Sequence, residues 1–213
     1  MHLSVPYIYM FVGVTATYPG PRYSEYDEIY TYQDPRKMLE NVRTLHLLRT
    51  SSNWSPLLTV CLKSNFVKAQ KSSYERTVEY YYLSKIPGNT RMDFHNITFR
   101  MTPNITAKSQ PYIHIEVVEG SGGLHAFQGA LSWLHYNGAE KHPVLYADNR
   151  CLLTGTLMKG VRTTCTMWVA QDAMGNPLRH CHFILQAMCG NPSYNAYAVE
   201  KGLCEHLRKF PRG

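Results

Sequence analysis

The stretch of sequence that decides the fold is TTCTMWVAQDAMGNPLRHCHFILQAMCG, residues 163–190. It begins with a strand-like run over 163–170, rich in Thr, Met, Trp and Val. Asn176-Pro177 then offers an N-cap and a first helical residue, and a glycine stands at the natural end of a helix over 178–189. A strand is thus followed by a helix that carries two cysteines, so covalent bonds can tie this helix to the rest of the fold.

Upstream of this stretch, apolar residues alternate with a period of two. We expect strands near 42–50, 57–67, 75–84, 92–101, 112–118, 124–135, 143–148, 151–157 and 163–170. Asp34-Pro35 predicts a short helix that reaches about Glu40, and the tail 191–213 is expected to be irregular. Eight or nine antiparallel strands between two helices predict an all-β fold with minor α content, closed into a barrel. A β-sandwich is the alternative, but it does not explain a C-terminal helix with two cysteines.

Composition excludes several other classes of protein. The chain has 213 residues, of which 44% are hydrophobic and 17% charged, so disorder, collagen and coiled coil do not describe it. The net charge of +7 is dispersed, without the basic block typical of a nucleic-acid-binding arm. No apolar run reaches the ~18 residues of a membrane span. The 16 tyrosines suit strands, cavities and interfaces.

Several features predict export from the cell. Residues 1–16 lack Lys, Arg, Asp and Glu and end in small residues, as a signal peptide does. Six cysteines without a C-x-x-C pair predict disulfides and no structural metal site. Three N-x-[ST] sequons predict glycosylation at Asn53, Asn96 and Asn104. Residues 17–33, rich in Tyr, Pro and Gly, are expected to form an N-terminal arm.

The chain resembles a known family, the tick salivary lipocalins, also called the histamine-binding protein family. The resemblance rests on DPRKMLENV (34–42), Cys61-Leu62-Lys63, VLYADNRC (144–151), CTMWV (165–169) and CHFILQAMCG (181–190). These pieces extend over residues 34–204, which we take as the barrel domain, with a C-terminal tail at 205–213. Residues 17–33 and 119–141 fall outside the resemblance.

The resemblance implies a secreted, monomeric, eight-stranded antiparallel lipocalin barrel with a short N-terminal helix and a C-terminal helix packed outside. Such a protein sequesters small host molecules at a blood-feeding site, in saliva. The resemblance also implies the disulfides Cys61–Cys204 and Cys151–Cys181, which leave Cys165–Cys189 as a third bridge. The cysteine count alone allows fifteen pairings.

Strand alternation then predicts which side chains line the barrel. Cysteines bridged to an outer helix point outward, and so does a glycosylated asparagine, so their strand neighbours point inward. The predicted ligand-binding residues are Val60, Leu62, Val78, Tyr80, Tyr82, His95, Ile97, Phe99, Ile113, Ile115, Thr166 and Trp168.

This lining predicts the chemistry of the ligand. Amine-binding members of the family carry carboxylates at positions that fall here on residues without an acidic side chain: Asn53, Ile97, His142, Leu152 and Thr166. A buried amine needs such counter-charges. We therefore expect a hydrophobic host mediator or lipid, such as a sterol, fatty acid or eicosanoid, whose capture suppresses host defence. An acidic lipid would also need a cation, for which the candidates are His95, Arg43, Arg49 and Arg100.

Two alternatives stay open at this point. Amine binding could persist through Glu79 or Asp93 if they turned inward. The barrel could instead be filled by its own side chains, and the protein would then act through its outer surface on a host immune protein or cell surface. Catalysis is not expected, because no G-x-S-x-G, H-E-x-x-H or P-loop occurs, and no cofactor or metal is predicted.

Overall fold

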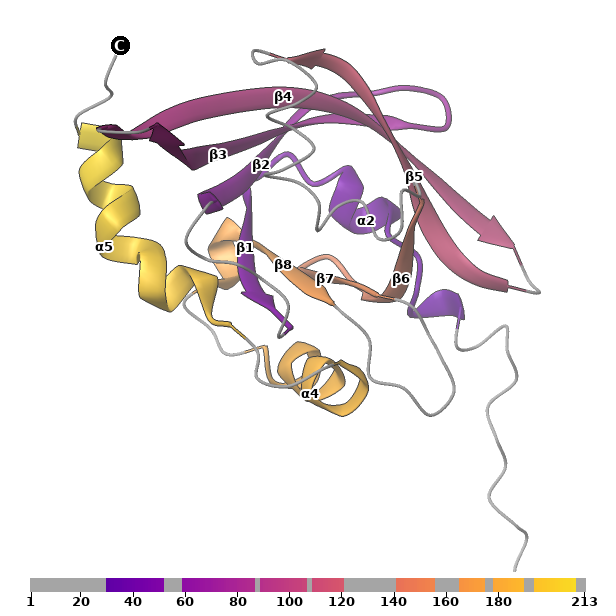
Figure 1. Cartoon of the computed structure of the whole chain (residues 1–213). Helices are drawn as coiled ribbons and strands as arrows, with labels where there is room; N and C mark the ends of the chain where they lie inside the picture. Colours follow the sequence, from indigo (N-terminus) through magenta and orange to yellow (C-terminus); the bar gives the residue numbers. More distant parts are fainter. Residues whose placement is uncertain are drawn as a thin grey trace, which may run out of the picture.

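The computed structural model describes residues 30–51, 59–86, 89–106, 109–120, 141–155, 165–174, 178–189 and 194–209 (Figure 1). Its strands are β1 (Leu45–Thr50), β2 (Thr59–Ala69), β3 (Tyr74–Ile86), β4 (Asn89–Thr106), β5 (Ser109–Gly120), β6 (Lys141–Ala147), β7 (Cys151–Thr154) and β8 (Thr166–Ala170). The helices are α2 (Arg36–Leu39), the 3-10 turn η2 (Gln171–Ala173), α4 (Arg179–Met188) and α5 (Ala196–Lys209).

The eight strands close into an antiparallel barrel in sequence order. Each strand pairs with the next, and β1 pairs with β8 through a register that includes Leu47 opposite Trp168. The predicted fold class is therefore confirmed. The strand expected at 124–135 lies outside the described residues, as do the expected signal peptide 1–16 and the arm up to residue 29. The end of that arm contacts β6, where the Ala147 N–H donates to the Tyr32 carbonyl at 2.7 Å.

The tail is not irregular as expected, because residues 196–209 form α5. The side-chain oxygen of Asn195 accepts the backbone N–H of Ala198 at 3.1 Å, which is how an N-cap satisfies a first-turn donor. Gly202 in the middle of the segment lowers its intrinsic helix propensity. Packing against the barrel and the Cys61–Cys204 disulfide stabilise this helix, and neither is visible in local sequence.

The wall between β1 and β2 is only partly closed by backbone hydrogen bonds. Register pairs join Leu45 to Ser64 and His46 to Lys63, and beyond them the two strands diverge. Cys61 has φ 62° at a register shift in β2, so the strand bulges there. α5 packs over β1 and β2 at this seam, and Ala196 joins the same apolar cluster as the barrel interior.

α4 covers a different part of the barrel. An apolar cluster between α4 and strands β6, β7 and β8 includes Leu153, Met167 and Leu185. The disulfides Cys151–Cys181 and Cys165–Cys189 both join this helix region to the barrel, and Cys61–Cys204 joins α5 to β2. These are the pairs that the resemblance implies.

Candidate functional site: the barrel interior

A narrow apolar cavity of about 50 Å³ lies inside the barrel. All eight strands and α2 contribute to its wall, which consists of Leu39, Leu45, Ser64, Arg76, Val78, Phe99, Met101, Ile113, Ile115, His142, Leu152, Thr154, Thr166 and Trp168. None of these side chains is acidic. The hydroxyls of Thr154 and Thr166 hydrogen-bond each other at 2.6 Å, which satisfies polar groups that would otherwise face an apolar space.

Arg76 is the one cation among these lining residues that carries a permanent charge, and it is fully buried. Its guanidinium donates to the backbone carbonyls of Leu39, Asn41, Arg43 and Ser64, and to the Ser64 hydroxyl, at 2.7–3.1 Å. These contacts use all five N–H groups of an arginine. Burial lowers the pKa of Arg76 to about 10, so it remains protonated at neutral pH. Its role here is to fasten the segment after α2 across the end of the barrel.

A second hollow of about 90 Å³ lies beside the cavity, under α5. Leu47, Leu62 and Tyr80 line it from the barrel, and residues of α5, including Tyr197 and Glu200, line it from outside. On β1, β2 and β3 these barrel residues are each two positions from a residue of the first cavity, namely Leu45, Ser64 and Val78. Inward side chains recur every second residue of a strand, so at this seam the hollow reaches the layer of the barrel next to the first cavity. Lys63, Glu79, Tyr81 and Phe94 line the same hollow from the outer face of the barrel wall.

Most of the predicted lining residues face the barrel interior. The first cavity contains Val78, Phe99, Ile113, Ile115, Thr166 and Trp168, and the second hollow contains Leu62 and Tyr80. Ile97 belongs to the same buried cluster, and Tyr82 packs against it. His95 stacks on Tyr80 with ring centroids 5.1 Å apart. Their role as ligand contacts stays a proposal.

The inward direction expected for Val60 does not fit the strand register. Val60 lies opposite Tyr81, whose hydroxyl points outward and donates to the Leu207 carbonyl of α5. Directly opposed residues of an antiparallel pair share one face of the sheet. The bulge at Cys61 shifts the alternation, so Val60 lies on the outer face and is left out of the proposed site.

Arg76 is the main site residue that the sequence prediction missed. The inward series Val78, Tyr80 and Tyr82 on β3 extends by the same period to residue 76, so the signal was present. An arginine is almost never fully buried unless its charge is satisfied. The backbone carbonyls that satisfy it come from a segment 33–37 residues away, and only the folded chain brings them together.

Four of the five positions at which amine-binding members of the family carry a carboxylate lie in this interior. His142, Leu152 and Thr166 line the cavity, Ile97 is buried nearby, and Asn53 lies outside the described residues. Glu79 does not turn inward: it pairs with Lys63 at 2.7 Å on the outer face, and its partly buried carboxylate also accepts from Asn65. Asp93 pairs with Arg91 at 2.7 Å. Neither carboxylate lines the apolar cavity, and Glu79 contributes to the hollow under α5.

Of the four candidate cations, His95 stacks on Tyr80, and the three arginines are engaged away from the cavity. Arg43 pairs with Asp172, and Arg100 pairs with Glu75 and Glu116. Arg49 lies opposite Met167, a residue of the outer cluster, and so faces outward. The sequons at Asn96 and Asn104 lie on β4 with exposed side chains.

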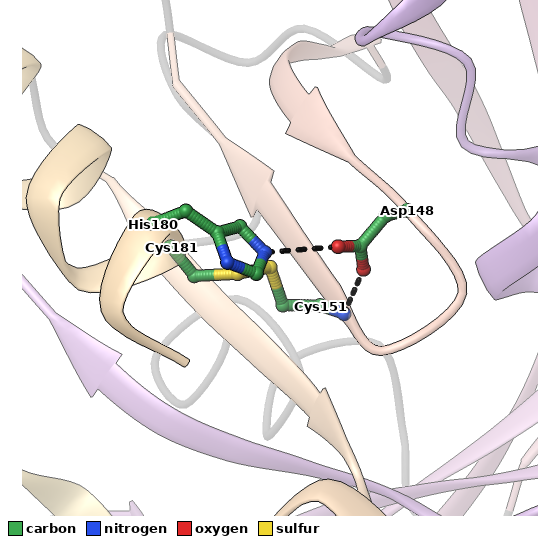
Figure 2. Close-up of side chains that lie close together, drawn as sticks. All are labelled: Asp148, Cys151, His180 and Cys181. Atoms are coloured by element: carbon green, nitrogen blue, oxygen red, sulfur yellow. Dashed lines mark hydrogen bonds and ion pairs between the residues drawn. A yellow bond between two sulfur atoms is a disulfide. The ribbon is translucent and has the colours of Figure 1, made fainter. Parts of the chain in front are cut away.

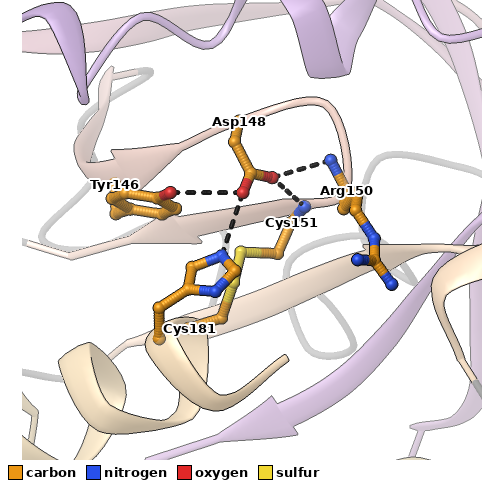
Figure 3. The surroundings of a disulfide bond; sticks show 6 residues. Tyr146, Asp148, Arg150, Cys151 and Cys181 are labelled. Atoms are coloured by element: carbon orange, nitrogen blue, oxygen red, sulfur yellow. Dashed lines mark hydrogen bonds and ion pairs between the residues drawn. A yellow bond between two sulfur atoms is a disulfide. The ribbon is translucent and has the colours of Figure 1, made fainter. Parts of the chain in front are cut away.

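A polar cluster outside the barrel joins α4 to the turn between β6 and β7. Asp148 accepts the N–H groups of Arg150 and Cys151 at 2.7 Å, His180 Nε2 lies at 3.0 Å, and the Tyr146 hydroxyl donates at 3.1 Å (Figures 2 and 3). Burial alone would raise the pKa of Asp148, but these hydrogen bonds bring it below its ordinary value. Both cysteines of the cluster form a disulfide and have no thiolate to bind a metal. The cluster therefore fastens α4 to the barrel.

Comparisons with known proteins place this geometry in context. No protein-family model matches the chain, and no curated protein matches it. Among solved structures, Japanin from Rhipicephalus appendiculatus, solved bound to cholesterol, superimposes with a TM-score of 0.52 at 16% identity, covering 72% of this chain and 91% of Japanin. Crustacyanin H1 from the lobster Homarus americanus matches at 11% identity and a TM-score of 0.44, over 84% of this chain and 92% of its own.

The chain has the lipocalin fold. At 16% identity the superposition on Japanin shows the fold that the resemblance implies. Among the described residues, no helix is long and apolar enough to cross a bilayer. The three disulfides suit an oxidising, extracellular compartment.

Proposed function

We propose that this chain is a secreted, glycosylated carrier that binds a small hydrophobic molecule inside its barrel and withdraws it from the host. The observation that carries the proposal is a closed barrel whose cavity is apolar and has no acidic side chain among the described residues that line it. Apolar surface removed from water supplies the binding energy, at about 25 cal/mol per Å². The fold shared with Japanin, which was solved bound to cholesterol, supports this class of ligand.

The biological context is part of the same proposal. Capture of a host mediator or lipid at a feeding site would suppress host defence by stoichiometric binding, without turnover. The signal peptide at 1–16 and the sequons at Asn96 and Asn104 support release in saliva.

The cavity must widen to admit a sterol or a fatty acid. Its volume of about 50 Å³ is only a few times what one water needs, about 10–15 Å³. Met101 lines it, and the unbranched thioether side chain of methionine readily changes shape. Val78 lines the first cavity and Tyr80, two residues later on β3, lines the hollow under α5, so small side-chain movements between them would join the two into one elongated space.

Native mass spectrometry of delipidated protein tests the proposal, with cholesterol and palmitic acid as probes. A matched pair of substitutions on β5 locates the binding: Ile115→Phe reduces the cavity, and Val118→Phe adds the same ring on an exposed position. We expect a bound lipid with the wild type and with Val118→Phe, and at least ten-fold weaker binding with Ile115→Phe. Failure of the wild type to take up either lipid, or equal weakening by both substitutions, would contradict binding in the barrel.

Biogenic amines provide the opposite control. Calorimetry with histamine and serotonin should give no heat of binding, because the described residues that line the apolar cavity include no acidic side chain to compensate a buried ammonium. In the hollow under α5, Glu79 is already paired with Lys63, and Glu200 accepts the Cys61 N–H. Binding at micromolar concentration would restore the amine alternative.

A further inference from the structure

The hydroxyl of Tyr80 is a polar group buried inside the barrel. Tyr80 is 1% exposed, and its hydroxyl has no hydrogen-bond partner among the described residues. An unsatisfied buried hydroxyl costs free energy that a phenylalanine at the same position would avoid. Such a group in a native structure calls for an explanation, and a missing ligand is one that fits a binding cavity.

Tyr80 stands at the junction of the two hollows. Its ring belongs to the apolar cluster of the barrel interior and lines the hollow under α5, while Val78, two residues earlier on β3, lines the first cavity. His95, directly opposite on β4, stacks against the ring at 5.1 Å and limits its movement. A ligand with its apolar body in the first cavity would therefore bring its end to the Tyr80 layer.

The hollow under α5 carries as many basic side chains (Lys63, Lys201, Arg208) as acidic ones (Glu79, Glu200, Glu205), so it presents no net charge that would favour an ionised ligand group. Burial, with a smaller effect of Tyr82, raises the pKa of Tyr80 to about 12, so the phenol stays protonated and can both donate and accept. Arg76, the permanently charged cation of the first cavity, already uses its five N–H groups within the protein. An ionised carboxylate at the ligand end would lack a counter-charge from it.

We propose that the ligand is a neutral amphiphile of the sterol type, and that its single hydroxyl hydrogen-bonds the hydroxyl of Tyr80. This inference rests on the proposed function and adds to it a class of ligand and a specificity-determining residue. A binding site built to satisfy a hydroxyl discriminates against the analogue that lacks it, because the protein group is then left unpaired.

The test compares cholesterol with 5α-cholestane, the same ring system without a hydroxyl, both delivered from cyclodextrin. Dissociation constants are measured for the wild type, for Tyr80→Phe, and for Tyr146→Phe, which removes a hydroxyl of the polar cluster outside the barrel. We expect the wild type and Tyr146→Phe to bind cholesterol roughly ten-fold more tightly than cholestane, and Tyr80→Phe to bind both alike. Palmitic acid should bind more weakly than cholesterol to the wild type.

Unfolding of the ligand-free protein gives an independent measurement. Tyr80→Phe should leave the melting temperature unchanged or raise it, because the hydroxyl has no partner to lose. A marked fall would show a structural partner and overturn the inference. Binding of both sterols with a ratio that Tyr80→Phe does not change would also overturn it, while leaving the proposed function intact. A wild type that binds neither probe would refute both.

Discussion

Two buried charged residues, Arg76 and Glu200, are stabilised in different ways. Arg76 satisfies all its donors with backbone carbonyls and the Ser64 hydroxyl. Glu200 accepts the Cys61 N–H at 2.6 Å and the Tyr194 hydroxyl at 3.2 Å beneath α5. Each therefore joins a helical segment to a strand, and each makes a prediction at the scale of one residue.

Arg76→Met should lower the free energy of unfolding by about 3 kcal/mol, because it leaves several buried carbonyls without a donor. Urea unfolding followed by circular dichroism measures the change. Arg91→Met is the control, since Arg91 is exposed and makes a surface ion pair that contributes at most about 1 kcal/mol. A similar loss in both variants would show that the buried network is not responsible.

Glu200 predicts a pH dependence of stability. Burial raises its pKa above the ordinary value of 4.5, against the opposing effect of its two hydrogen bonds. A carboxyl group whose pKa is higher in the folded than in the unfolded state adds fully to the free energy of unfolding at pH values below its unfolded-state pKa. This contribution is lost as the pH rises through its folded-state pKa. Thermal unfolding from pH 4 to 8 should show this decline in the wild type and a flatter profile in Glu200→Gln. Parallel profiles would contradict the assignment.

At the scale of the element, α5 is part of the barrel wall. It packs over the seam where β1 and β2 diverge, and the Thr50 and Tyr194 backbones exchange hydrogen bonds at 3.0 and 2.7 Å. The Cys61–Cys204 disulfide joins residues 143 apart in sequence, a separation for which chain entropy predicts at most about 5 kcal/mol of stabilisation.

Replacing Cys61 and Cys204 together by Ser should loosen α5 selectively. We expect faster hydrogen exchange in the α5 amides, with little change in the long β3–β4 pairing, because the seam lacks the hydrogen bonds that hold other strands together. The double variant of Cys165 and Cys189 serves as control, since that bridge ties the α4 region and leaves α5 attached. Equal exchange rates in α5 of both variants would argue against this role.

At the scale of the whole molecule, binding inside the barrel should stabilise the fold. A ligand that binds only the native state adds about 2.7 kcal/mol at a free concentration one hundred times its dissociation constant. The melting temperature of delipidated protein should therefore rise with cholesterol concentration and remain constant with histamine. A filled barrel that acts through its outer surface predicts no rise with either compound, and this result would favour the alternative function.

The barrel itself was predictable because its cause is local. Alternation along β3 and β4 places one face of each strand in the core, and this pattern correctly directed Val78, Ile97 and Phe99 inward. The helix expected over 178–189 is α4, Arg179–Met188, with Leu178 as its N-cap residue. The expected start and end signals, Asn176-Pro177 and Gly190, lie outside the described residues. Val60 and α5 were mispredicted because a bulge and a distant disulfide decide them.

Sequence by itself thus determined the fold class, the helix that follows the last strand, and an interior without the acidic residues of an amine site. Only the tertiary structure decided how Arg76 is satisfied, where α5 closes the wall, and that the hydroxyl of Tyr80 is buried without a partner. The physical reason is range: strand alternation and helix caps act within a few residues, whereas burial and hydrogen bonding of a side chain depend on segments far away in the chain.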